Sequence, residues 1–131
     1  MDVAESAIIS IVDDDESVRD AVESLLKSLG FGVAVFASAE GFLHSGQLQD
    51  TACLILDVRM PGMNGLDLQS HMAREGRQVP IIFITSHADD DAHERALEAG
   101  AVAFLYKPCR EEDLIDAIDV ALGRSRDPDK P

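Results

Sequence analysis

The sequence has few of the residues that mark secreted or membrane-embedded proteins. It contains only 2 cysteines, Cys53 and Cys109, which form no C-x-x-C pair and cannot frame a disulfide scaffold. No apolar run is long enough to span a membrane, and the acidic N-terminus carries no signal-peptide pattern. We therefore expect a cytoplasmic, reduced protein with no membrane attachment. Cys53 precedes an apolar run, which predicts a small buried hydrophobe.

Basic residues are also scarce. The chain has 11 Lys and Arg against 25 Asp and Glu, giving a formal net charge of -14. Nucleic-acid binding depends on Lys and Arg neutralising backbone phosphates, and anionic lipid surfaces attract the same residues. We therefore expect no direct nucleic-acid binding and no membrane binding. The negative charge instead favours a cation, or a partner with a basic face.

What is present is an alternation of short apolar runs with amphipathic stretches, over 131 residues of which 46% are hydrophobic. Apolar, β-branched runs predict buried strands, and apolar residues at helical spacing predict helices. The expected strands cover Ile8–Val12, Val33–Phe36, Cys53–Leu56, Val79–Ile84 and Val102–Tyr106. The expected helices cover Val18–Leu29, Ser38–Leu43, Leu66–Ala73, Asp89–Ala99 and Glu111–Leu122.

This pattern of strand and helix, repeated five times, predicts the fold class. Continuous apolar strands alternating with helices indicate a parallel sheet covered on both faces, and right-handed crossovers make it an α/β doubly wound five-stranded sheet. Residues 1–123 are expected to form this single domain. Residues 124–131, RSRDPDKP, are expected to be a polar tail or the start of a linker.

Polar side chains follow most of the expected strands, at the point where each strand ends. In a doubly wound sheet, ligands bind outside the carboxyl ends of the strands. Because these ends share one edge of a parallel sheet, the side chains should lie close together. They are Asp13, Asp14, Asp57, Thr85 and Lys107.

The chemistry of this group points to a metal and a phosphoryl group. Two carboxylates about 4 Å apart repel each other by roughly 4 kcal/mol at an effective dielectric constant of ~20, so such a cluster raises a pKa or holds a cation. Oxygen ligands without His or Cys select Mg²⁺ or a similar ion. Thr85 could donate to a phosphate oxygen, Lys107 could neutralise another, and a carboxylate could act as the nucleophile.

Each of these residues taken singly also has a structural explanation. Asp15 is expected to be a helix cap rather than a ligand. Thr85 alone would more often be a capping hydroxyl, and Lys107 alone a solvated lysine. The acidic run 89–91 fits a helix N-terminus. No metal-binding spacing, and no chemistry, is assigned to the histidines, which are His44, His71, His87 and His93.

Four motifs, in this order and at these intervals, carry a resemblance to a known family: IVDDDESVR, LILDVRMPGMNGLDL, IIFITSHAD and FLYKPC. From Ile8 to Leu122 the sequence resembles the receiver domain of bacterial two-component response regulators, the CheY-like family. The runs DVRMPGMNG and FASAEGFL are similar to the FixJ type. The resemblance implies a flavodoxin-like (βα)5 fold with strand order 2-1-3-4-5, an order for which CheY is a standard example.

The resemblance also implies a role for each matching residue at the acidic edge. Asp57 matches the phosphoacceptor. Asp14 matches a direct Mg²⁺ ligand, and Asp13 one that acts through water. Arg59 would offer its backbone carbonyl to the same ion.

Further roles implied by the resemblance concern the conformational switch. Thr85 matches the switch hydroxyl, Lys107 the lysine of the phosphoryl site, and Phe104 the aromatic switch position. The Lys107–Pro108 bond would be cis. Cys109 is the one departure, since family members often carry Phe there, and it leaves the chemistry intact.

The function implied by the resemblance is a phosphorylation-dependent switch, not an enzyme acting on other substrates. A sensor histidine kinase would donate the phosphoryl group to Asp57. The surface of the fourth helix, fifth strand and fifth helix would then change and meet an output domain or partner, and so control transcription. Homodimerisation on phosphorylation is implied by analogy alone.

The sequence also bears on three other functions. A haloacid-dehalogenase-like phosphatase needs a carboxylate two residues after the nucleophile, where this chain has Arg59. A P-loop nucleotidase needs G-x-x-x-x-G-K-[ST], which is absent from the sequence. A receiver-like interaction module that takes no phosphate is the third, although nothing at the acidic edge looks degraded. Mass change on incubation with acetyl phosphate and Mg²⁺ discriminates between the module and the switch.

Overall fold

The computed structural model describes residues 7–86 and 89–123. The predicted tail, 124–131, and His87 lie outside these residues. Within them, no helix is both long and apolar enough to cross a membrane.

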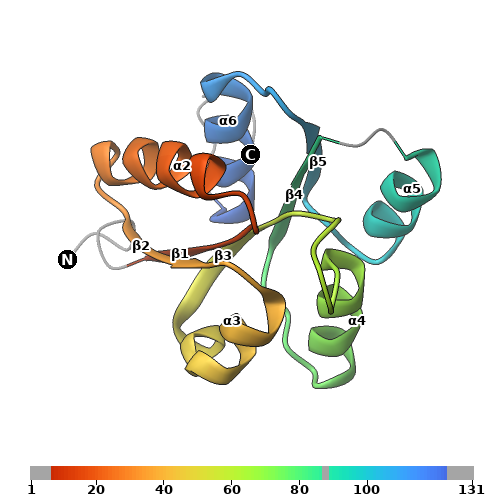
Figure 1. The fold of residues 1–131 in the computed structure, drawn as a ribbon. Helices are drawn as coiled ribbons and strands as arrows, with labels where there is room; N and C mark the ends of the chain where they lie inside the picture. Colours follow the sequence, from red (N-terminus) through yellow and green to blue (C-terminus); the bar gives the residue numbers. More distant parts are fainter. Residues whose placement is uncertain (1–6, 87–88, 124–131) are drawn as a thin grey trace.

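The strands form one parallel sheet of 5 strands in the order β2-β1-β3-β4-β5 (Figure 1). This confirms the predicted doubly wound topology and strand order. Strand order reverses beside β1, so the carboxyl ends of β1 and β3 border the crevice where ligands bind in such sheets. The bounds of the strands are β1 Ile8–Val12, β2 Gly32–Phe36, β3 Thr51–Leu56, β4 Ile81–Thr85 and β5 Ala103–Tyr106.

Four of the five α-helices in the described residues begin at a side chain that accepts from a free N–H group of the helix, and the last begins at Arg110 without such a bond. Asp15 and Ser38 cap the helices that follow them, as predicted, and Asp89 caps another. Asn64 forms a capping box with Asp67. The bounds of the helices are α2 Glu16–Ser28, α3 Ala39–Ser45, α4 Gly65–Arg74, α5 Asp90–Glu98 and α6 Glu111–Ala121.

Two apolar cores lie on opposite faces of the sheet, because successive strand residues point to opposite sides. One core joins α2 and α6 to residues such as Ile9, Ile55 and Ile82. The other joins α3, α4 and α5 to Leu54 and Phe83, among others. Figure 1 shows α2 and α6 over one face and α3, α4 and α5 over the other. Covering both faces leaves the strand ends as the place where polar groups gather.

Two local expectations need correction. The fourth strand starts at Ile81, not Val79, because Pro80 has no N–H to donate to the ladder; its carbonyl accepts from the backbone N–H of Leu54 at 2.9 Å. A short 3₁₀ helix, Gln47–Asp50, precedes β3 and was not predicted, since it carries no apolar period. Cys53 is fully buried, as expected.

Candidate functional site

The ends of β1 and β3 carry the acidic residues. The backbone N–H of Asp57 donates to the carbonyl of Val12 at 3.0 Å, which extends the pairing of these strands by one residue. The backbone N–H of Asp13 likewise donates to Phe36 at the end of β2, at 3.1 Å. These bonds fix both aspartates at the strand ends, as their place in the sequence predicted.

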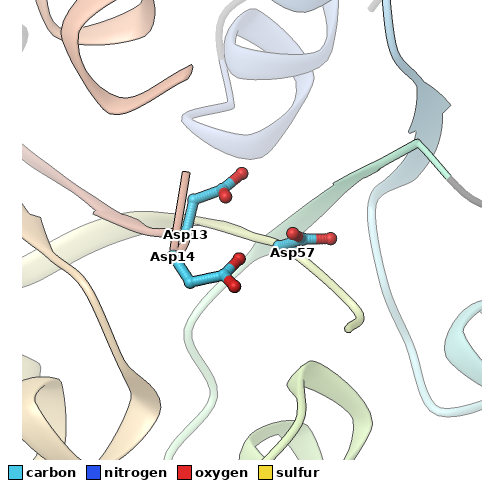
Figure 2. A group of neighbouring side chains, drawn as sticks. All are labelled: Asp13, Asp14 and Asp57. Atoms are coloured by element: carbon cyan, nitrogen blue, oxygen red, sulfur yellow. The ribbon is translucent and has the colours of Figure 1, made fainter. Parts of the chain in front are cut away.

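Three carboxylates meet at this edge. One oxygen from each of Asp13, Asp14 and Asp57 lies within 4.8 Å of the others. Figure 2 shows the side chains of Asp13 and Asp14 extending from adjacent residues toward the side on which Asp57 lies. Asp13 and Asp57 are buried, with 3% and 6% of their surface exposed, whereas Asp14 is exposed. The cluster is therefore open to solvent mainly on the side of Asp14.

Lys107 provides the positive charge of the site. Its Nζ lies 2.9 Å from Oδ2 of Asp13 and 3.5 Å from Oδ2 of Asp57. The backbone N–H of Lys107 donates to the carbonyl of Thr85 at 2.7 Å, so the end of β4 positions the lysine. The Lys107–Pro108 bond is cis, as expected from the resemblance. The structure thus brings Asp13, Asp14, Asp57 and Lys107 together.

The surroundings of Asp57 favour the neutral form of its carboxyl group. Burial first, and the charge of Asp13 second, raise the pKa of Asp57, although Lys107 and the backbone N–H of Arg59 act in the opposite direction. Burial alone would lower the pKa of Lys107, but its hydrogen bond with Asp13 and the two carboxylate charges outweigh that effect and raise it. The lysine therefore stays charged, and it compensates the carboxylates incompletely.

One oxygen of Asp57 is left without a partner. Oδ1 is buried and accepts no hydrogen bond. A buried carboxylate oxygen without a donor is costly, and it is the kind of atom that a cation or a transferred group would engage. Three hard oxygen donors with no nitrogen or sulfur ligand suit Mg²⁺. The residues present therefore fit a magnesium ion.

Contacts around Asp13 hold its backbone and carboxylate in place. Its Oδ1 accepts from the backbone N–H of Asp15 at 2.9 Å, and its carbonyl accepts from Nη1 of Arg19 at the same distance. Arg19 was not singled out from the sequence, because its place in a helix gives no sign of this contact. With Lys107 on Oδ2, both carboxylate oxygens of Asp13 have partners. Asp14 carries no such restraint.

The segment after Asp57 is held by α3. Glu40 accepts a hydrogen bond from the backbone N–H of Met63 at 2.9 Å, and this bond is the largest cause that lowers the pKa of Glu40. A side chain at Gly65 would overlap the carbonyl of Asp57, so the chain here approaches Asp57 closely. The guanidinium of Arg59 lies 3.5 Å from Oδ2 of Asp89 and does not join the acidic cluster.

The expected switch residues lie on β4 and β5, on the same side of the sheet order as Lys107. Thr85 is buried as the last residue of β4, and its register partner is Tyr106. Phe104 is buried on β5 opposite Phe83. The ring of His93, on α5, stacks on Phe104. Sequence reasoning gave His93 no role, since its ring contact depends on the packing of α5 against β5.

Comparison with known proteins gives the family. The family model of the response regulator receiver domain matches residues 9–119 of the sequence. Response regulator protein TmoT from Ectopseudomonas mendocina is 51% identical over 119 residues, covering 90% of this chain and 54% of TmoT. Transcriptional regulatory protein FixJ from Azorhizobium caulinodans is 38% identical over 121 residues, covering 92% and 57%. The chain thus spans about half the length of the curated relatives it matches.

Solved structures agree. The response regulator StyR superposes with a TM-score of 0.84 at 43% identity, over 90% of this chain and 60% of StyR. The crystal structure of FixJ-N gives a TM-score of 0.80 at 36% identity, over 89% and 94%. A CheY4 chemotaxis protein from Vibrio cholerae gives 0.79 at 26% identity, over 88% and 98%. The chain therefore belongs to the response regulator receiver domain family, the signal-receiving unit of two-component systems.

Proposed function

We propose that Asp57 of this receiver domain accepts a phosphoryl group from a sensor histidine kinase, with Mg²⁺ bound at the acidic edge. The observation that carries the proposal is the buried Oδ1 of Asp57, which accepts no hydrogen bond, in a carboxyl group that lies beside two further carboxylates and an ammonium group. Similarity to TmoT and FixJ supports the same assignment.

Asp14, Asp57 and the backbone carbonyl of Arg59 would hold the ion, with Asp13 acting through water. Bound there, Mg²⁺ would neutralise charge on the carboxylates and on the transferred phosphoryl oxygens. Asp14 is suited to direct binding because it is exposed and unrestrained, whereas both oxygens of Asp13 already accept hydrogen bonds.

The transfer itself needs only positioning and charge neutralisation. A carboxylate oxygen of Asp57 attacks the phosphorus of the phosphohistidine, a new O–P bond forms, and the electron pair of the broken P–N bond returns to the imidazole. The ionised form of Asp57 is the nucleophile, and Lys107 favours that form. The Nζ of Lys107, which lies 3.5 Å from Oδ2 of Asp57, can then donate a hydrogen bond to a negatively charged phosphoryl oxygen.

The switch follows from the same edge. The hydroxyl of Thr85 would donate to the new phosphoryl group, and Phe104 would rotate into the space that Thr85 leaves. The surface of α5, β5 and α6 would change with it and meet an output domain or another protein, such as a second copy of the chain. The domain would act in the cytoplasm, catalyse only its own phosphorylation and dephosphorylation, and regulate transcription through that output.

Mass spectrometry after incubation with acetyl phosphate and Mg²⁺ tests this function. We expect a single adduct of about 80 Da, one phosphoryl group, which Asp57→Asn abolishes because an amide is no nucleophile for this transfer. Asp50→Asn is the matched control, since Asp50 precedes the amino end of β3, whereas Asp57 follows the carboxyl end of the same strand. An unmodified wild-type protein would instead support an interaction module, and steady turnover of a phosphate ester would support a phosphatase.

A further inference from the structure

A group of aromatic rings joins α5 to β5. The ring of His93 lies 4.6 Å from that of Phe104, at an interplanar angle of 6°, which is a stacked pair. Nδ1 of His93 lies 2.9 Å from the hydroxyl of Tyr106, so a hydrogen bond fixes the orientation of the imidazole. Phe104 and Tyr106 are two residues apart on β5 and therefore point to the same face. His93 thus contacts both through one ring.

Elsewhere α5 is held to the domain mainly by small side chains. Its buried residues are Ala92 and Ala96. Nε2 of Gln69, on α4, donates to the carbonyl of Ala96 at 3.1 Å. Alanine side chains make few contacts, so the large ring of His93 is a principal link between α5 and β5. Phe104 is therefore in direct contact with α5 through the ring of His93.

The same rings are connected to the phosphoryl site through β4. Tyr106 pairs in register with Thr85, and Phe104 pairs with Phe83, whose ring centroid is 5.6 Å away. The backbone N–H of Lys107 donates to Thr85. Any displacement of Thr85 toward Asp57 thus occurs directly beside the strand that carries both aromatic rings.

We propose that His93 is a positioning residue of the switch: it holds the ring of Phe104 by stacking and transmits the phosphorylation-dependent movement of that ring to α5. The inference rests on the proposed phosphorylation of Asp57. Since Phe104 is already buried beneath its neighbours, it cannot change rotamer without losing or remaking the parallel stack with His93. The hydrogen bond to Tyr106 keeps the imidazole aligned for that contact.

Backbone amide NMR shifts, recorded before and after phosphorylation with acetyl phosphate and Mg²⁺, test this role. We expect His93→Ala to take the phosphoryl group at Asp57, as mass spectrometry will show, while the shift changes of residues 90–98 fall by about twofold or more. His93→Phe keeps a stacking ring without the ring nitrogens and should restore most of the response. Tyr106→Phe removes only the hydroxyl and should lower the response less than His93→Ala.

The matched control is His44→Ala, which removes an exposed histidine from α3 on a different part of the domain and should behave as wild type. A full α5 response in His93→Ala, or a loss in His93→Phe equal to that in His93→Ala, overturns the proposal. Should the alanine variant not fold, His93→Leu replaces it with the same expectation, because leucine keeps apolar volume but no ring. Absence of any adduct in wild type would refute the phosphoacceptor function itself, and is separately visible in the mass spectrum.

Discussion

The acidic edge and the α5–β5 contact are adjacent parts of one domain, held by different forces. At the edge, Asp13, Asp57 and Lys107 are fixed by backbone pairing, and charges dominate their energies. At the contact, His93 and Phe104 are held by ring stacking on a helix whose buried residues are alanines. The first region has many polar contacts and an unbalanced charge, whereas the second depends on a few apolar contacts. This difference is what the proposed switch would use, since a local charge event can bias a neighbouring packed element.

Removing the ammonium group of Lys107 should have the largest effect on the stability of the metal-free protein. Lys107→Ala leaves two buried carboxylates without their shared ammonium group, and breaking a buried ion pair in this way typically costs several kcal/mol. Because Lys107 keeps some exposure and Asp57 can protonate, we expect a loss near the lower limit, about 3 kcal/mol. Urea unfolding without Mg²⁺ measures it.

Lys27→Ala provides the matched control for that change. Lys27 forms a 3.1 Å ion pair with Glu23 along α2, and its side chain is 63% exposed. An exposed pair of this kind contributes about 0.5 kcal/mol or less. Equal losses in the two lysine variants would contradict the view that the acidic edge is a buried, unbalanced charge cluster.

The contrast between the two regions also explains what could be predicted from the sequence. Asp13, Asp57 and Lys107 follow apolar strands, and parallel topology alone brings the ends of such strands to one edge. Capping residues such as Asp15 are likewise recognisable, because their partners lie a few residues along the chain. The fold and the acidic edge were therefore accessible from sequence pattern and resemblance together.

The contacts that were missed are those between distant elements. Glu40 binds the backbone of Met63, 23 residues away, and His93 meets Tyr106, 13 residues away. Neither spacing corresponds to a helical or strand period, so the partner depends on how helices dock on the sheet. His93 is a single half-buried histidine in a polar helix, and the sequence around it does not indicate which residue it contacts.

A weaker effect is expected when one prospective metal ligand is removed. Asp14→Ala should lower Mg²⁺ affinity on the order of tenfold, since loss even of an outer-shell partner commonly costs that much. Asp20→Ala, on the exposed side of α2, is the control and should leave the affinity unchanged. Calorimetric titration with Mg²⁺ compares them. Wild-type affinity in Asp14→Ala would show that the exposed carboxylate of the cluster is no ligand.

The smallest effect, a pH-dependent difference in melting temperature, tests the charge imbalance at Asp57 directly. The folded-state pKa of Asp57 lies above its ordinary value of 3.8, chiefly through burial and then through the charge of Asp13, so ionised Asp57 destabilises the metal-free fold at neutral pH. Asp57→Asn should therefore melt a few degrees higher than wild type at pH 7, roughly what ~1 kcal/mol produces in a domain of this size. As pH falls through the raised pKa toward 3.8, wild-type Asp57 becomes neutral and the difference should shrink.

Comparing wild type with Asp57→Asn at each pH removes the contributions of carboxyl groups whose pKa is shifted in the opposite direction to that of Asp57. The pKa values of Asp15 and Glu40 are lowered in the folded state, so they stabilise the fold above their ordinary pKa values, and that stability is lost as pH falls in both proteins. The contributions of such groups, which lie outside the Asp13–Asp57–Lys107 cluster, cancel in the subtraction. A melting difference that stays constant, or grows, toward acid would mean that Lys107 fully balances the acidic edge. The acidic edge would then not carry the unbalanced charge that sets it apart from the α5–β5 contact.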